Sequence, residues 1–233
     1  MRIFYLLFWA LALGCSKKDT TPEDIGKVSG TVKDQSGIPI QQVQIVVDNS
    51  IFFNSNISTK TGSNGTYSLA LPKTGAWYAF AIHRIPFNGK TYQCYLHPDD
   101  PTGFGSEGAI RNFTWKLTGQ KAQPLTGHYG GTITVDHFPG VYLDTEDIQF
   151  TLIPEGNLID GSPGQTLIRY ANDGIQVLDV PIGRYKMSAR YGEESLKLRR
   201  WNSEDVFVKE LILDFEPQID AQCDNCFKLE FNR

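Results

Sequence analysis

Four side chains that commonly bind metals or transfer protons lie close together within residues 84–111. They are His97, Asp99, Asp100 and Glu107. Their carboxylates could gather around Ca2+, which takes about six to eight oxygen ligands, and a histidine beside an acid suits general acid–base chemistry. The spacing matches no established calcium loop, and acids in surface loops are usually solvated. We therefore treat the four as candidate ligand-binding residues and assign no metal, no cofactor and no catalytic residue.

Aromatic side chains in the same segment suggest a second kind of site. Tyr92, Tyr95 and Phe104, together with Phe52 and Phe53 from an earlier loop, could form a flat platform for sugar rings. Aromatic rings combine a large apolar area with, in tyrosine, a polar edge, and this suits such ligands. The alternative, which we favour, is that these rings are buried against a neighbouring domain.

The cysteines allow one local crosslink. Besides Cys15 the chain contains Cys94, Cys223 and Cys226. The pair Cys223-Asp-Asn-Cys226 opens the last expected strand, where a turn belongs. A zinc ribbon would need a second pair, and a redox CxxC motif would need a thioredoxin-like context. We expect a disulfide between Cys223 and Cys226, with free thiols as the alternative, and Cys94 either unpaired or replacing one partner.

Enzyme motifs give no further candidates. Residues 103–108 read Gly-Phe-Gly-Ser-Glu-Gly and fit G-x-G-x-x-G, but a proline-rich loop precedes them and a strand-like segment follows. A dinucleotide site needs a strand before the motif and a helix after it. The chain contains no G-x-S-x-G or H-E-x-x-H motif, and its four histidines are not spaced as metal ligands. The sequence predicts that the protein is not an enzyme.

Alternating apolar residues predict an all-β fold of two tandem small β-sandwiches, transthyretin-like or Ig-like. The alternating sets are Val28/Gly30/Val32, Val43/Ile45/Val47, Tyr67/Leu69/Leu71 and Phe113/Trp115/Leu117 in the first half, and Ile133/Val135, Ile148/Phe150/Leu152, Tyr185/Met187/Ala189, Leu211/Leu213/Phe215 and Phe227/Leu229/Phe231 in the second. Residues 77–83 carry apolar side chains on both faces of the expected strand and are expected to be buried on both faces. We expect the sandwiches at residues 27–119 and 125–233, with residues 84–111 as a long loop insertion in the first.

Part of the first half resembles a known family. The residues are Val28-Ser-Gly-Thr-Val-Lys-Asp34, Gly37-Ile-Pro39-Ile40 and Val43, followed by Gly65-Thr-Tyr67-Ser-Leu69, Pro72 and Gly75. They resemble the carboxypeptidase regulatory-like domain, a small transthyretin-like β-sandwich. The resemblance covers residues 27–82 and 113–117 and implies a non-catalytic appendage, linker or binding surface. A shorter motif in the second half, Pro181, Gly183 and Tyr185, is similar to part of the first half and suggests a second sandwich of a related, carbohydrate-binding-like type.

The first fifteen residues indicate where the protein is located. Arg2 precedes an apolar run from Ile3 to Leu13, which is shorter than the roughly 20 residues that span a bilayer and is typical of a signal peptide. Leu11-Ala-Leu-Gly-Cys15 resembles the bacterial lipobox, which implies cleavage before Cys15 and acylation of that residue, for example with palmitate. Residues 1–14 are thus expected to be a lipoprotein signal peptide, with an ordinary secretion signal as the alternative. Residues 15–26 are expected to be a polar, flexible tether.

The residues that follow Cys15 resemble the start of Bacteroidota lipoproteins. This implies an outer-membrane protein that faces the periplasm or the cell surface. The net charge is −4, with 22 Lys and Arg against 26 Asp and Glu, and the one basic cluster is residues 197–200. Nucleic-acid binding needs a concentrated basic face, so the charge argues against a nucleic-acid partner.

Together these features predict a non-catalytic envelope lipoprotein held on the membrane through its lipid anchor. It is expected to act as a binding or spacer module for a glycan or an envelope protein. Two alternatives remain: a purely structural component of an envelope complex, or an enzyme with an unrecognised site in residues 84–111.

Overall fold

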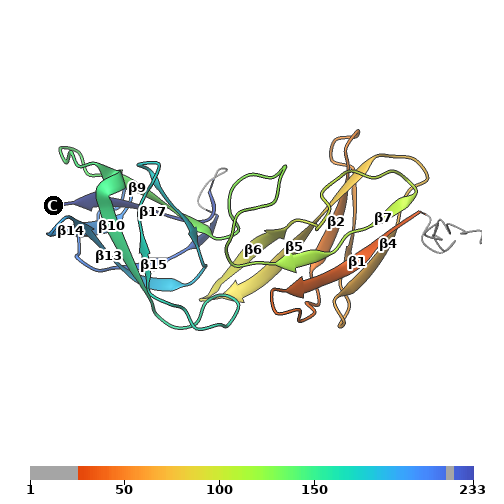
Figure 1. The fold of residues 1–233 in the computed structure, drawn as a ribbon, viewed down its shortest axis with the longest axis horizontal. Coiled ribbons are helices and arrows are strands. Elements are labelled where there is room, and N and C mark those ends of the chain that lie inside the picture. Colours follow the sequence, from red (N-terminus) through yellow and green to blue (C-terminus); the bar gives the residue numbers. More distant parts are fainter. Residues whose placement is uncertain (1–25, 219–222) are drawn as a thin grey trace, which may run out of the picture.

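The computed structural model describes residues 26–218 and 223–233, which form two β-sandwiches arranged end to end (Figure 1). The expected signal peptide (residues 1–14), Cys15 and the expected tether up to residue 25 lie outside the described residues. Gly26, expected to be the last tether residue, is part of the first sandwich: its N–H donates to the Glu107 carbonyl at 3.0 Å. Within the described ranges no helix is long and apolar enough to cross a membrane.

The first sandwich packs two sheets against each other. Its strands are β1 (Lys27–Asp34), β2 (Gln44–Asn49), β3 (Asn56–Lys60), β4 (Thr66–Ala70), β5 (Trp77–Phe87), β6 (Lys90–Leu96), β7 (Gly108–Ile110) and β8 (Phe113–Trp115). One sheet has the order β4-β1-β7, with β8 continuing beside β1, and the other has the order β3-β2-β5-β6. The inward residues of the predicted alternating sets, such as Val32, Ile45 and Phe113, form its core. The all-β sandwich prediction is confirmed.

The second sandwich is one nine-stranded sheet folded around a single core. Its strands are β9 (Gly131–His137), β10 (Ile148–Pro154), β11 (Leu167–Arg169), β12 (Gln176–Val180), β13 (Arg184–Tyr191), β14 (Glu194–Arg200), β15 (Leu211–Asp214), β16 (Glu216–Gln218) and β17 (Asp224–Asn232), with a short 3-10 turn η2 (Thr145–Asp147). The strand order is β11-β10-β13-β14-β17-β9-β12, with β15 beside β13 and β16 beside β17. The start of β14 pairs with β13 and its end pairs with β17, so β14 passes from one layer to the other.

The first half of the segment expected to be a loop insertion is a hairpin, and a short strand, β7, ends it. β5 continues to Phe87, a two-residue turn follows at Asn88 and Gly89, both with positive φ, and β6 returns to Leu96. Asn-Gly is the preferred pair for such a turn, because both central residues must adopt a left-handed backbone. Only residues 97–107 form a loop, so the expectation of one long loop is wrong.

The end of this hairpin joins the two sandwiches (Figure 1). Tyr92 belongs to the buried core cluster of the second sandwich, and Ile85, Phe87 and Cys94 pack against the same cluster. The Tyr92 hydroxyl donates to the Phe215 carbonyl at 2.6 Å. The hairpin is therefore a structural part of both sandwiches.

Polar contacts add to this junction. The Lys90 ammonium pairs with Glu216 at 2.9 Å, and the Asn225 amide donates to the Gln93 carbonyl at 3.0 Å. In the linker, the Asp179 carboxylate accepts from the Gly119 N–H at 2.9 Å. Such contacts restrict how the two sandwiches can move relative to each other.

Strand β5 corrects a second expectation. Trp77, Ala79 and Ala81 are buried in the core, but Tyr78 on the opposite face is 41% exposed. The strand lies in a two-layer sandwich, so only one of its faces meets the other sheet. The expectation that residues 77–83 are buried on both faces is therefore wrong: Trp77 points into the core, whereas Tyr78 and Phe80 lie on the outer face.

Candidate functional site

The three predicted acidic site residues are engaged within their own loop. Asp99 accepts from the backbone and side-chain nitrogens of Asn112, both at 3.1 Å. Asp100 accepts from the Thr102 N–H and hydroxyl and pairs with Arg111 at 3.1 Å. The hydrogen bonds from Thr102 lower the pKa of Asp100. These contacts order the loop between β6 and β8.

The fourth residue of the predicted set points elsewhere. The His97 ring lies 6.4 Å from the Tyr129 ring, in the linker between the sandwiches. Burial lowers the pKa of His97, and the nearby Lys121 charge lowers it further. Glu107 accepts from the Gly105 N–H at 2.9 Å, a bond that lowers its pKa together with one to its own backbone N–H. In the part of the chain that the structure describes, no group of three or more His, Cys, Asp and Glu side chains could hold a metal ion.

The aromatic residues of the predicted platform do not lie together. Tyr92 is buried at the junction, and Phe104 is buried in the first core beneath Arg111, whose guanidinium lies 5.2 Å from the Phe104 ring centre. Tyr95 remains 44% exposed. Alternation along β6 explains the difference, because Tyr92 is on the inner face of the strand and Tyr95 on the outer face.

A different set of aromatic residues does form a continuous surface. Tyr78, Phe80 and Tyr95, here called the aromatic strip, lie on the outer face of the sheet β3-β2-β5-β6. The Tyr78 and Phe80 rings are stacked with centroids 6.3 Å apart, and Phe80 lies 6.4 Å from Tyr95. Sequence reasoning missed Tyr78 and Phe80. The local sequence carries no clear signal, because bulky side chains occur at both parities of residues 77–83, Trp77 on the inner face and Tyr78 and Phe80 on the outer face.

Hydrogen-bonding side chains border the aromatic strip. The Tyr78 hydroxyl donates to the Asp48 carboxylate at 2.7 Å, and this bond raises the pKa of Tyr78. Arg84 donates to the Gln44 side-chain carbonyl at 2.6 Å. Asp48 lies directly opposite Tyr78 in the strand register, and Gln44 opposite Ile82. The face therefore offers flat apolar rings with donors and acceptors at their edges.

The loop after β2 extends this surface. Phe52 and Phe53, both predicted platform residues, are exposed and line a shallow groove together with Asp48 and Tyr78. The Asn49 side-chain carbonyl accepts from the Phe52 N–H at 3.0 Å and holds the loop at the strand end. Of the five aromatic residues predicted from the sequence, three thus lie on or beside the aromatic strip.

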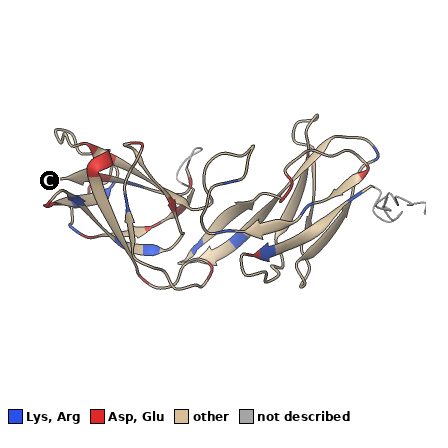
Figure 2. Cartoon of the chain, viewed as in Figure 1, with Lys and Arg blue, Asp and Glu red and all other residues tan. Residues whose placement is uncertain are grey.

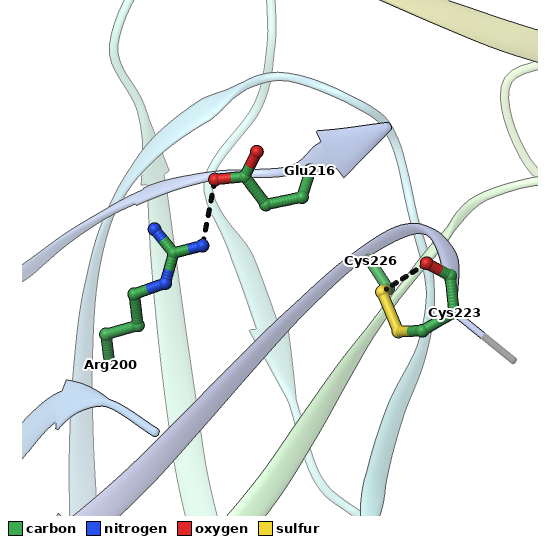
Figure 3. The surroundings of a disulfide bond; sticks show 4 residues. All are labelled: Arg200, Glu216, Cys223 and Cys226. Carbon is green, nitrogen blue, oxygen red and sulfur yellow. Dashed lines mark hydrogen bonds and ion pairs between the residues drawn. A yellow bond between two sulfur atoms is a disulfide. The ribbon is translucent and has the colours of Figure 1, made fainter. Parts of the chain in front are cut away.

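The structure joins Cys223 and Cys226 by a disulfide at the start of β17 (Figure 3). The ion pair between Arg200 and Glu216, at 3.0 Å, lies nearby. Cys94 is a free thiol at the junction of the sandwiches, and burial raises its pKa to about 11. A thiol with so high a pKa is a poor nucleophile at neutral pH.

Charge is distributed without a dominant sign. Figure 2 shows lysine and arginine residues interspersed with aspartate and glutamate along both sandwiches. The basic residues of β14 are partly neutralised: Arg199 pairs with the buried Glu230 at 2.7 Å. This arrangement agrees with the argument against a nucleic-acid partner.

No protein-family model and no curated protein matches the chain. Among solved structures, the chain is similar to the Bacillus anthracis TIE protein, with 10% identity over 89% of this chain and 34% of that chain and a TM-score of 0.34. It is also similar to a Streptococcal ancillary pilin, with 10% identity, 91% and 64% coverage and a TM-score of 0.30. A B repeat unit of the collagen binding surface protein of Staphylococcus aureus shares 13% identity, with 88% and 96% coverage and a TM-score of 0.25. The chain thus spans about a third of the first protein and 64% of the second. At such low identity and TM-score, the likeness goes no further than the all-β architecture.

Proposed function

We propose that this protein is a non-catalytic binding module of a bacterial cell envelope, anchored by lipid at Cys15, that binds a glycan on the first sandwich. The observation that carries the binding function is the aromatic strip. Two of its rings, Tyr78 and Tyr95, are exposed and the half-buried Phe80 connects them, and a contiguous aromatic patch on a protein surface is typical of a binding surface.

The pattern of the strip favours a glycan over a protein partner. A sugar ring presents an apolar face and a polar edge, and the strip presents aromatic faces bordered by Asp48, Gln44 and Arg84. The central part of a protein–protein interface is usually a broader apolar patch with fewer charged groups. The resemblance of the first sandwich to carboxypeptidase regulatory-like domains supports a module of this non-catalytic kind.

The strip also yields a direct test. We expect Tyr78→Ala and Tyr95→Ala each to weaken glycan binding about 10-fold, because an aromatic ring that stacks on a ligand contributes roughly 1–3 kcal/mol. The double variant should lose binding. The measurement is a glycan array with the full-length protein, followed by calorimetry with the best ligand.

Tyr170→Ala is the matched control, because Tyr170 is 43% exposed but lies on the second sandwich. It should bind as the wild type does. Array signals that survive in the double variant would contradict a role for the strip, and an array with no glycan bound would contradict the function itself.

Lipid anchoring is tested separately. Two or more acyl chains hold a protein stably on a membrane, at about 0.8 kcal/mol per buried CH2. We therefore expect Cys15→Ala to move the protein from the membrane fraction to the soluble fraction and to abolish labelling by radioactive palmitate. Wild-type protein that takes up no palmitate would refute the anchor and leave the glycan site untouched.

The junction of the two sandwiches favours a second role, as a spacer. The hairpin β5–β6 belongs to both units, so the module would hold the two sandwiches in a defined orientation relative to each other. An enzyme built on His97, Asp99, Asp100 and Glu107 receives no support from the geometry, because His97 points to the linker and each acid is hydrogen-bonded within its loop.

A further inference from the structure

A second groove with the properties of a sugar site lies on the second sandwich, on the outer face of β17 and β9. It has a volume of about 460 Å³ and is lined by Trp201, Lys228, Thr134, Asp136, Thr145 and Ile175, among others. Trp201 forms one wall and is 46% exposed, and Ile175 on the opposite side is 56% exposed. The groove is wide enough for one or two sugar rings, since small-ligand pockets are typically about 300–1,000 Å³.

Hydrogen bonds hold the backbone around Trp201 in place. Its backbone N–H donates to the Lys228 carbonyl at 3.0 Å, which ties the turn after β14 to β17. The next residue, Asn202, has a left-handed backbone, and its N–H donates to the buried Glu230 carboxylate at 3.3 Å. Glu230 in turn accepts from Arg199 at 2.7 Å. These bonds fix the backbone of Trp201, and its half-exposed indole forms part of the groove lining, where a ligand can stack on it.

The polar groups of the groove suit hydroxyl groups better than an ionic ligand. The Lys228 ammonium lies 5.7 Å from the centre of the Trp201 ring, and the Asp136 carboxylate is also part of the lining. His137 is also in the lining, and its backbone N–H donates to the Asp136 carboxylate at 2.8 Å. Lys228 and Asp136 leave the groove without a dominant charge. Thr134 and Thr145 add hydroxyls that can both donate and accept. Such a set matches the hydroxyls of a neutral sugar and offers an anionic sugar no excess of positive charge.

We infer that this groove, here called the Trp201 groove, binds a neutral hexopyranose unit of a glycan, stacked on Trp201 and hydrogen-bonded by Asp136. The site is on a different sandwich from the aromatic strip and does not depend on it. With both sites present, one chain would contact a polysaccharide at two places and would bind a long glycan more tightly than a short one.

The test uses the full-length protein labelled with 15N. The probes are neutral tetrasaccharides of glucose, mannose, galactose and N-acetylglucosamine, with tetragalacturonate as the anionic comparison, each added up to about 20 mM. The indole resonance of Trp201 is identified by its loss in Trp201→Phe. We expect at least one neutral tetrasaccharide to shift that resonance and tetragalacturonate not to shift it.

Two further variants assign the effect to the groove. Asp136→Ala should weaken the neutral ligand at least 5-fold, whereas the double variant Tyr78→Ala, Tyr95→Ala should leave the Trp201 shift unchanged. The inference is overturned if none of the neutral probes shifts the indole, if tetragalacturonate alone does so, or if Asp136→Ala binds as the wild type does. Loss of the Trp201 shift in the double variant would also overturn it, because the two sites would then be one. Glycan binding by the aromatic strip is measured in a separate experiment, so a negative result at one site does not contradict the other site.

Discussion

Replacing Tyr92 by alanine should lower the free energy of unfolding of the second sandwich by about 3–5 kcal/mol, even though Tyr92 belongs to a strand of the first. The ring is buried in the core cluster of the second sandwich, and its hydroxyl donates to the Phe215 carbonyl at 2.6 Å. Truncation removes both the packing and the hydrogen bond, and it leaves a cavity at the junction.

The measurement is hydrogen exchange of the amides of β17 (Asp224–Asn232), which lie at the centre of the nine-stranded sheet. Tyr92→Ala should speed their exchange in proportion to the lost stability. If only amides of the first sandwich respond, the two units are independent and the spacer role loses its basis.

Two variants separate packing from polar contact. Tyr92→Phe should lower the free energy of unfolding by only about 1 kcal/mol, because it keeps the ring and because the Phe215 carbonyl still accepts from Lys90 at 3.2 Å. Tyr95→Ala changes the same strand on its exposed face and should alter stability by less than about 0.5 kcal/mol. Burial of the Tyr92 hydroxyl also raises its pKa.

Gly30→Ala should destabilise the first sandwich by at least about 3 kcal/mol. A Cβ at this position would meet the Arg111 carbonyl carbon at 2.7 Å and would clash with its oxygen more closely still. The neighbouring contacts leave little room for movement: the Arg111 N–H donates to the Ser29 carbonyl at 2.8 Å, and the Tyr67 hydroxyl donates to the Arg111 carbonyl at 2.7 Å. An added methyl group must push apart backbones that these bonds hold together.

Urea denaturation monitored through the buried Trp77 reports this effect. The matched control is Gly103→Ala, because a Cβ there would meet its nearest atom at an acceptable 3.4 Å and the residue has no positive φ. That variant should unfold at the wild-type urea concentration. Equal midpoints of urea unfolding for the two variants would show that the structure accommodates a Cβ at Gly30 with no loss of stability.

Local sequence determined much of the fold. The residues that alternate in the sequence, such as Val28 with Val32 and Ile148 with Leu152, are buried in the two cores. This is expected because a strand exposes one parity of its residues to each face. The Asn88-Gly89 turn was missed, although its residue pair is a strong local signal for a two-residue hairpin, because residues 84–111 were interpreted as one loop.

The candidate sites were less accessible from sequence. Residues 84–111 contain the right residue types for a site, but their side chains are used inside the loop, as Asp99 is by Asn112, or at the junction, as Tyr92 is. The Trp201 groove was missed altogether, because it is assembled from β9, β17 and the turns beside them. These segments are far apart in the chain, and only the strand order brings them together.

The sequence by itself determined that this chain is built of strands and, for most of them, which residues share a face. Tertiary structure alone decided which of the two faces would be covered and by what. The physical reason is that alternation assigns a side chain to a face but not to a neighbour. Tyr92 is therefore buried by a second domain, while Tyr95, three residues along the same strand, remains open to a ligand.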